Sequence, residues 1–349
     1  MRNLAPSQNK RIDYLDFLRV VAISSVISFH FLFSAISRGR TPQLTPSPFF
    51  EWARYGYLGV ELFFMITGFV MVNSVQNLTV LQFLKKRFLR LYPMYWIALI
   101  LIFAISTFGI WNRTGPTAEL FYYNLTMFPN SFSQPWLDAA HWFMARQLQF
   151  YLAISLILLF KAGKHLGNIF CWWSIVGSFV YLMNLETFNI WYFDGFFSLI
   201  SGGAIINVIR TNGFNQIRVA GLIASYIWAV QSRTSFVHWL DLNRGSGHSE
   251  LIIGLVVTGI YLAMMLTWSS KITKIVMPGI GVAGTLSYPL YLIHDRLGGL
   301  ALARFATESN KYFAYTLVVC AAVLLAYFIW KLESRIMSIF KKPNQVGGD

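Results

Sequence analysis

Two ionisable side chains, Arg19 and His30, stand eleven residues apart in an otherwise apolar run near the N-terminus. Eleven residues at about 100° each return a helix to within roughly 20° of its starting direction, so both side chains share one helix face, roughly 16 Å apart along the axis. Histidine changes its charge near neutral pH, and arginine binds phosphate and carboxylate groups. The pair therefore suggests anion binding at one depth and proton transfer at another.

A purely structural interpretation of this pair is also open. Arg19 could extend toward a membrane surface beside Asp16, and His30 could bond a neighbouring helix. Ionisable groups at membrane depth are nevertheless costly, so they normally face a partner or a cavity. The pair alone does not decide between the two interpretations.

Other apolar runs contain further possible acids and bases, namely Glu61, His141, Arg146, Asp194, His294 and Asp295. With the topology derived below, all of them fall toward the non-cytoplasmic side, at a depth similar to that of His30. The cytoplasmic mouth carries a basic cluster of Lys85, Lys86, Arg87 and Arg90. We expect a phosphate-rich ligand on the inner side and proton transfer near the outer side. The basic cluster by itself would suit an ordinary positive-inside loop.

Apolar helices must position these residues. The 349 residues are 56% hydrophobic and 12% charged, with a mean hydropathy of +0.53, which excludes a disordered chain and makes a soluble enzyme improbable. A helix that crosses a bilayer needs about 20 mostly apolar residues. Ten runs satisfy this: 14–37, 57–76, 91–110, 142–161, 169–185, 192–209, 217–232, 249–268, 280–299 and 312–331. We predict an all-α integral membrane protein with about ten transmembrane helices.

The basic residues give an orientation. With the N-terminus inside, 17 Lys and Arg residues lie in cytoplasmic segments and 9 on the opposite side, which places both termini in the cytoplasm. The net charge of +14 is therefore mainly a topology signal, and we expect no nucleic-acid partner. The predicted organisation is a cytoplasmic segment 1–13, a ten-helix membrane domain 14–336 and a cytoplasmic tail 337–349.

Metal and disulfide chemistry are not indicated. The histidines lack metal-ligand spacing, and Cys171 and Cys320 lie far apart in apolar runs, so we expect no metal site. The pairs Gly202-Gly203 and Gly298-Gly299 suit close helix packing rather than a phosphate-binding loop.

Five motifs in chain order resemble the membrane acyltransferase 3 family, which includes O-antigen and exopolysaccharide O-acetyltransferases. They are Arg19 and His30 as Arg-x10-His, Gly59 to Phe69, Arg87 to Pro93, Trp142 to Leu152, and Leu286 to His294. The resemblance covers residues 11 to about 336 and implies no fused extracytoplasmic domain in this chain.

The resemblance implies acyl transfer at a membrane, most simply the bacterial inner membrane. Cytoplasmic acyl-CoA, usually acetyl-CoA, would be the donor substrate, with no permanently bound cofactor. The acceptor would be a hydroxyl of a cell-surface glycan or a lipid-linked precursor. The candidate site residues are His30, Glu61 and His294 for catalysis, Arg19, Arg87 and Arg90 for the CoA phosphates, and Arg146, Tyr288 and Trp142 for substrate contacts.

Several roles stay open among these candidates. His30 would be a general base or a transient acyl carrier, oriented or assisted by Glu61 or His294. Arg146 and Tyr288, with Ser287, are alternatives for stabilising an oxyanion. Gln147 stands where many relatives have Glu, and Glu61 replaces the commoner Asp.

The alternative function is a multi-span transporter or channel for a small polar or anionic solute. Ten spans and polar residues at membrane depth would suit it equally well. The ordered motifs and the basic inner mouth favour acyl transfer, and no internal symmetry of the kind common in transporters is visible. A structural subunit or a glycan polymerase would leave the spacing of Arg19 and His30 unexplained. The sequence does not indicate an oligomeric state.

Overall fold

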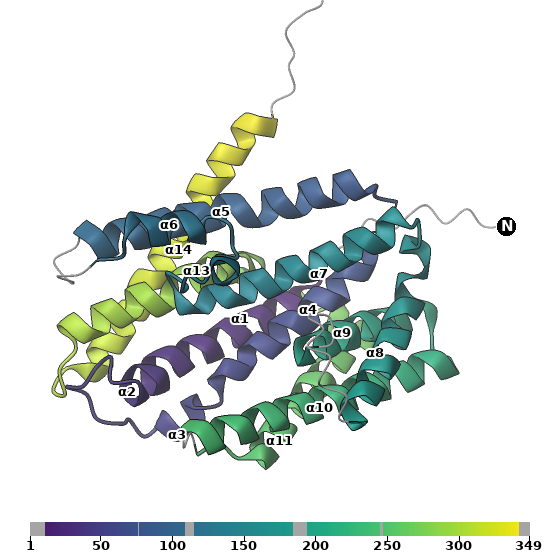
Figure 1. Cartoon of the computed structure of the whole chain (residues 1–349), viewed down its shortest axis with the longest axis horizontal. Helices are drawn as coiled ribbons and strands as arrows, with labels where there is room; N and C mark the ends of the chain where they lie inside the picture. Colours follow the sequence, from purple (N-terminus) through teal and green to yellow (C-terminus); the bar gives the residue numbers. More distant parts are fainter. Residues whose placement is uncertain (1–10, 76, 109–114, 184–193, 245–246, 342–349) are drawn as a thin grey trace, which may run out of the picture. The chain divides into compact units, whose positions relative to one another are not determined.

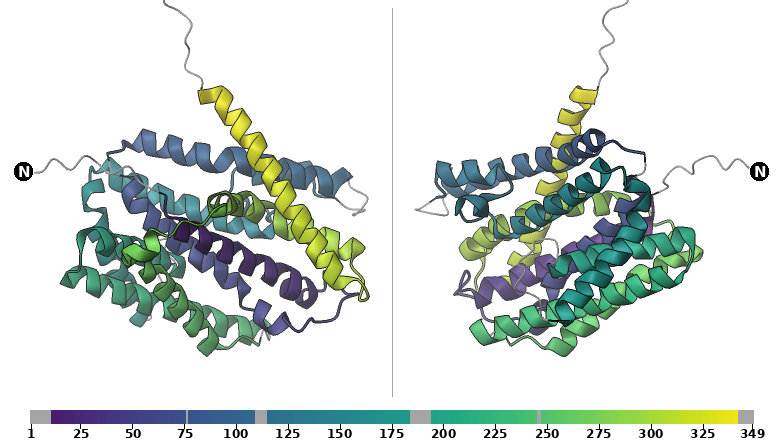
Figure 2. Two further views of the ribbon diagram at one scale, coloured as in Figure 1. Left: turned by 180° about the vertical axis from the view of Figure 1, so that it is seen from behind. Right: turned by 45° about the vertical axis from the view of Figure 1, so that its right-hand side comes forward.

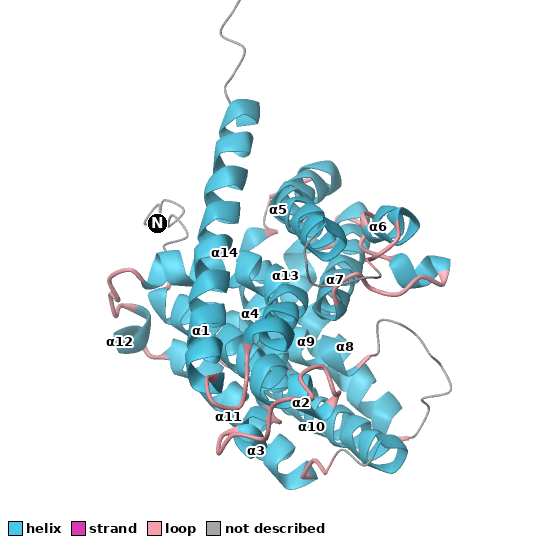
Figure 3. Ribbon diagram, turned by 90° about the vertical axis from the view of Figure 1, so that its left-hand side faces the viewer, coloured by secondary structure: helices cyan, strands magenta, loops and turns pink. Residues whose placement is uncertain are grey.

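The computed structural model describes residues 11–75, 77–108, 115–183, 194–244 and 247–341. Every secondary-structure element within these ranges is helical, as Figure 1 shows with its helix labels and Figure 3 with its colouring. The predicted all-α fold is therefore confirmed for the described part of the chain. The predicted terminal segments lie mostly outside the described residues, although the last helix continues to Lys341, beyond the predicted domain end at residue 336.

Within the described ranges, six helical segments are long and apolar enough to cross a membrane, and each overlaps one of the predicted spans. They are Asp13–Ser37, Phe50–Ser74, Val80–Phe108, Ala139–Leu159, Glu250–Trp268 and Lys311–Ser338. The other four predicted spans correspond to helices as well: α8 (Leu166–Leu182), α9 (Gly195–Asn212), α10 (Gln216–Arg244) and α13 (Ile280–Phe305). These four are shorter or carry more polar and charged residues, so the full count of ten spans stays a prediction.

The chain divides into two compact units. The first unit comprises Met1–Phe29, Glu51–Leu84 and Gln147–Thr285, and the second comprises His30–Phe50, Lys85–Arg146 and Leu286–Asp349. The remaining helices are α1 (Asp13–Ser28), α2 (Ala35–Ser37), α3 (Phe50–Ala53), α4 (Gly59–Ser74), α5 (Val80–Phe108), α6 (Ala118–Asn124), α7 (Trp142–Leu159), α11 (Glu250–Met265), α12 (Ser270–Thr273) and α14 (Lys311–Lys341). Unit boundaries fall between Phe29 and His30 and within α3, α5, α7 and α13.

The first unit is built around α9, which packs against α4, α8 and α10. The views in Figures 1 and 2 show the teal and green helices α8 to α11 side by side. Small residues permit the closest approach: a Cβ added to Gly203 would lie 1.9 Å from the carbonyl oxygen of Met65, and one added to Gly68 would lie 1.8 Å from that of Ile200. The predicted packing role of the Gly202-Gly203 pair is thus confirmed.

The second unit is held together by hydrogen bonds between its helices. Tyr95 of α5 donates to the carbonyl of Asn124 over 2.6 Å, and Tyr288 of α13 donates to the carbonyl of Leu91 over 2.9 Å. Gly298 lies against the ring of Phe31, where an added Cβ would come within 2.3 Å. These contacts fix the part of α13 that carries His294.

The first predicted span is helical but not regular to its end. After α1 ends at Ser28, residues Phe29–Ser34 form a π-helix, and α2 follows at once. A π-turn widens the helix locally, and such turns occur often at functional sites. His30 is the second residue of this wider turn.

Candidate functional site

The second unit brings His30 against a carboxylate. Nδ1 of His30 lies 3.0 Å from Oδ1 of Asp295, and the same carboxylate oxygen accepts a 2.6 Å hydrogen bond from Nη1 of Arg40. The Asp295 side chain is only 3% exposed, so its charge requires these partners. A carboxylate beside Nδ1 favours a proton on that nitrogen, which leaves Nε2 of a neutral His30 as the proton acceptor.

A second histidine stands next to this pair. The ring of His294 lies 5.0 Å from that of His30, edge to face, and its side chain is fully buried. Its Nδ1 lies 2.8 Å from the carbonyl oxygen of Tyr291. Because a carbonyl only accepts, Nδ1 must donate, and the lone pair sits on Nε2. Within the described residues, Nε2 of His294 has no hydrogen-bond partner.

The segment before α7 contacts the turn of α13 that carries His294 and Asp295. The Tyr291 hydroxyl donates to the carbonyl of Ala140 over 2.8 Å, and Nε2 of His141 lies 2.8 Å from the carbonyl oxygen of Leu292. Asp138 accepts from the backbone N–H of Arg296 over 3.0 Å. Burial raises the pKa of the Asp138 carboxyl above its usual value. His141, predicted as a possible acid or base, thus serves to position the turn that carries His294 and Asp295.

The predicted substrate contacts also belong to the second unit. Trp142 and Arg146 lie in the first turns of α7 and are half-buried. The Tyr288 hydroxyl donates a hydrogen bond to the carbonyl oxygen of Leu91. Of the residues predicted to hold CoA phosphates, Arg87 is buried in α5 and Arg90 is exposed there.

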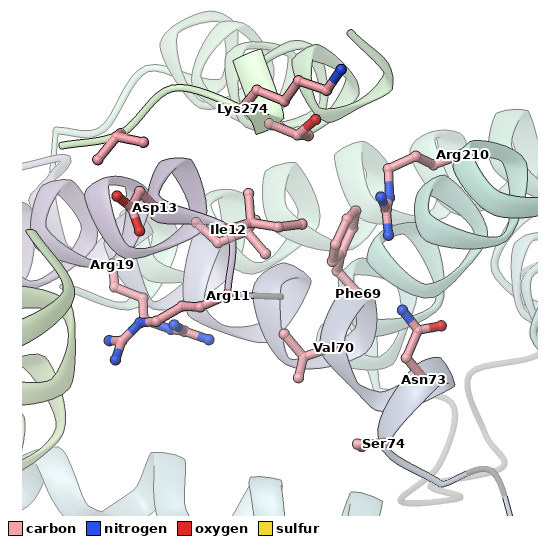
Figure 4. A pocket seen from close by; sticks show the side chains of 13 residues that line it. Arg11, Ile12, Asp13, Arg19, Phe69, Val70, Asn73, Ser74, Arg210 and Lys274 are labelled. Atoms are coloured by element: carbon pink, nitrogen blue, oxygen red, sulfur yellow. The ribbon is translucent and has the colours of Figure 1, made fainter. Parts of the chain in front are cut away.

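The first unit contains a basic pocket of about 770 Å³. Its lining includes four cations, which are Arg11, Arg19, Arg210 and Lys274 (Figure 4). Arg19 is the predicted anion-binding residue of the first span. Its Nη1 donates to Oδ1 of the buried Asp16 over 2.5 Å, and Arg11 binds Oδ2 of the same carboxylate. The hydrogen bond between Arg11 and Asp16 raises the pKa of the Arg11 guanidinium above its usual value.

Glu61, the third catalytic candidate, belongs to the first unit and is paired there. Its Oε1 lies 3.3 Å from Nη1 of Arg233, whose Nη2 lies 3.8 Å from Asp194. The guanidinium carbon of Arg233 also lies 4.1 Å from the centre of the Phe196 ring. Of the predicted acids and bases, His30, His294 and Asp295 lie in the second unit, whereas Glu61 and Asp194 lie in the first.

Gln147, which the resemblance marked as a departure, contacts two hydroxyl groups in the first unit. Its Nε2 donates to the Tyr151 hydroxyl over 2.8 Å and lies 3.4 Å from Oγ1 of Thr67. An amide at this position acts as a donor, whereas a carboxylate would accept the proton of the tyrosine.

Four site residues were not predicted as such from the sequence. They are Arg11, Arg40, Arg210 and Lys274, which enter the sequence analysis only through the count of basic residues. A spacing of three residues between Asn207 and Arg210 is the one local sign that the two side chains meet on a helix. Arg40 lies in a loop after α2, where periodicity carries no information.

Comparisons with known proteins identify similarity to acyltransferases. A family model described as an acyltransferase domain matches residues 12–332. The chain is also similar to a peptidoglycan O-acetyltransferase, OatA, of Listeria monocytogenes serovar 1/2a. The two are 24% identical over 338 residues, which cover 84% of this chain and 50% of the relative, so the chain spans about half the relative's length. No solved structure matches the chain.

Proposed function

Since this chain is an integral membrane protein that belongs to the acyltransferase 3 family, we propose that it moves an acetyl group from cytoplasmic acetyl-CoA to a hydroxyl of a cell-surface glycan. In this proposal the chain crosses the membrane ten times, with both termini in the cytoplasm. The observation that carries it is the arrangement of His30, Asp295 and His294. An imidazole held by a carboxylate is a suitable base for activating a hydroxyl.

If His30 acts as the general base, the proton follows one path. Nε2 of His30 takes the proton of the acceptor hydroxyl as the oxygen attacks the thioester carbonyl. The C–S bond then breaks, the acetyl group stays on the acceptor oxygen, and the CoA sulfur leaves with the proton that His30 received. Asp295 stabilises the imidazolium in between, and Arg40 favours the ionised form of Asp295. If His30 instead carries the acetyl group, the same nitrogen is the nucleophile.

The basic pocket is the proposed entry for the donor. Its lining comes from the start of α1, the end of α4, the end of α9 and the segment 273–276. The predicted topology places all four at the cytoplasmic side, where acetyl-CoA is available. A volume of about 770 Å³ falls within the usual range for small-molecule sites. The four cations of its lining supply the positive charge that phosphates require.

For the acceptor of the acetyl group, we propose a class of molecule rather than one compound. The relative's name specifies peptidoglycan, but the similarity covers half of that protein, so we propose an envelope glycan or its lipid-linked precursor. Trp142, with Arg146, is the proposed acceptor contact, because indole rings pack against sugar faces and guanidinium groups bond hydroxyls.

Mass spectrometry of envelope glycans tests the function directly. Cells that lack the gene are compared with cells complemented by the natural sequence, by His30→Ala or by Gly254→Ala as a matched control. An added Cβ at Gly254 meets nothing within 4 Å. We expect the natural sequence and the control to restore a mass increment of one acetyl group, and His30→Ala to fail at equal protein level. No increment with the natural sequence, or full restoration by His30→Ala, would contradict the proposal.

A further inference from the structure

The four cations of the basic pocket differ in how their charge is compensated. Arg11 and Arg19 share the buried carboxylate of Asp16, so part of their charge is already neutralised within the protein. Arg11 is engaged further, because it donates to the carbonyl of Gly281 and over 3.0 Å to Oγ1 of Thr285. This side of the pocket is held together by its own ion pairs.

Arg210 is held by neutral groups instead. Its Nε and Nη2 donate to Oδ1 of Asn207 over 3.2 and 2.9 Å, and its guanidinium carbon lies 5.4 Å from the centre of the Phe69 ring. Asn207 is fully buried and is itself fixed, since its Nδ2 donates to the carbonyl of Phe69 over 2.8 Å. The guanidinium is therefore oriented without losing its charge.

Among the described residues, no carboxylate lies within ion-pair distance of Arg210 or Lys274, and Nη1 of Arg210 makes no hydrogen bond. Figure 4 shows the guanidinium groups of Arg11 and Arg19 next to one another, with Arg210 apart from them beside Phe69 and Asn73. A fixed cation with unused N–H donors facing a pocket is preorganised for an anion, because little side-chain entropy remains to be lost on binding.

We propose that Arg210, positioned by Asn207, is the phosphate-binding residue of this pocket, with Lys274 as a weaker second cation. The inference rests on the proposed function, in which the ligand is acetyl-CoA. The chemistry recognised is a phosphate group, and an anionic lipid headgroup could present the same group. Arg19 then serves chiefly to balance Asp16, and most of the binding specificity for phosphate comes from α9.

Binding measurements on the full chain in neutral-lipid nanodiscs test this assignment. Acetyl-CoA is titrated against the natural protein and Arg210→Gln, with Arg218→Gln as the matched control. Arg218 loses the same charge from the same predicted membrane side, but it bonds the carbonyls of Asn212 and Gly213 outside the pocket. We expect a Kd at least tenfold higher for Arg210→Gln and a change below twofold for the control.

Acetyl-pantetheine, which has no phosphate, separates phosphate recognition from a general disturbance of the pocket. Arg210→Gln should leave its affinity unchanged. An equal loss of affinity for acetyl-pantetheine and acetyl-CoA would overturn the assignment. A change confined to binding of phosphatidylglycerol vesicles, with acetyl-CoA affinity intact, would also overturn it and would identify a lipid headgroup as the source of the phosphate.

Two further variants guard against misfolding and test the positioning role. Lys274 is exposed, so Lys274→Gln should fold normally and raise the Kd for acetyl-CoA about threefold. Asn207→Leu should raise the Kd in the natural background but have no additional effect in the Arg210→Gln background, because the two residues act through one group. Independent, additive effects would contradict the role assigned to Asn207.

The outcomes distinguish this inference from the proposed function. If the natural protein acetylates its acceptor and Arg210→Gln binds acetyl-CoA normally, only the assignment of Arg210 fails. If the natural protein neither binds acetyl-CoA nor transfers acetyl groups, the proposed function itself fails.

Discussion

The basic pocket of the first unit and the histidine cluster of the second unit handle charge in opposite ways. In the pocket, Arg210 and Lys274 have no carboxylate partner among the described residues. In the cluster, Asp295 is buried between His30 and Arg40, and its charge is matched inside the protein. An open cationic pocket suits a ligand that brings its own negative charge. An internally balanced cluster suits proton transfer, in which the charge only changes place.

Replacing Asp295 by Asn removes the carboxylate from the histidine cluster, and it has the largest expected effect. The amide can no longer favour a proton on Nδ1 of His30 or stabilise the imidazolium, so we expect the acetyl-transfer rate to fall about a thousandfold or more. The affinity for acetyl-CoA should stay within twofold, because the pocket is built from other residues. Transfer rate and Kd are measured on the same nanodisc preparation.

Glu250→Gln is the matched control for Asp295→Asn, because Glu250 is an exposed carboxylate whose partner is the exposed His238. A parallel loss of transfer rate and acetyl-CoA affinity in Asp295→Asn would show that the two regions do not have separate tasks.

The frame of the pocket offers a second test. A side chain at Gly203 must push α4 away from α9, since its Cβ would lie 1.9 Å from the carbonyl oxygen of Met65. These helices carry Phe69 and Asn207, whose hydrogen bond orients Arg210. We expect Gly203→Val to destabilise the protein by about 2 kcal/mol or more and to raise the Kd for acetyl-CoA more than tenfold. Thermal unfolding and donor titration measure the two effects.

Gly254→Val is the control for Gly203→Val, because its surroundings are open. Gly254→Val should unfold at the same temperature as the natural protein. Normal donor affinity in a folded Gly203→Val protein would mean that the close contact of α4 and α9 does not determine the geometry of the pocket.

Tyr291→Phe tests how the turn of α13 that carries the histidine cluster is held in place. The substitution removes one hydrogen bond, from the Tyr291 hydroxyl to the carbonyl of Ala140, while the bond from His141 to Leu292 remains. The loss of one buried hydrogen bond costs about 1 kcal/mol. We expect a transfer rate lowered less than tenfold with donor affinity unchanged. A loss as large as that of Asp295→Asn would mean that the turn of α13 has no other support.

The depth of each residue in its predicted span anticipated part of this site. His30, His294 and Asp295 were expected at a similar depth, and the structure brings them together. Span depth says nothing about helix rotation or about which helices are neighbours, so the ion pair of Glu61 with Arg233 could not be predicted from it. The apolar runs also predicted the helices themselves, because length and hydropathy are local properties.

Other features depend on tertiary contacts that no local pattern records. The π-turn at Phe29–Ser34 lies within a mostly apolar run whose local pattern gives no sign of it. Arg40 comes from a loop, and its role exists only because Asp295, distant in sequence, lies beside it. The orientation of Arg210 likewise depends on the carbonyl of Phe69 in another helix.

Glu308 provides the smallest test, on a charge that belongs to neither region. This exposed carboxylate accepts hydrogen bonds from Lys311 and from the backbone N–H and hydroxyl of Thr45, the latter two over 2.9 and 2.7 Å. The bond from Lys311 lowers the pKa of Glu308 to about 2. Because the folded-state pKa lies below the unfolded value of about 4.3, the stabilisation is present above that pH and is lost as the pH falls toward 2.

The unfolding temperature of the natural protein should therefore exceed that of Glu308→Gln slightly at neutral pH, and the difference should shrink between about pH 4 and pH 2. Solvent screens an exposed pair, so the difference should be smaller than the effect of Gly203→Val. Donor affinity and transfer rate at neutral pH should not change, since Glu308 lies in the loop between α13 and α14. A change in either would mean that this loop is coupled to the pocket or to the histidine cluster, and that charges outside the two regions also tune them.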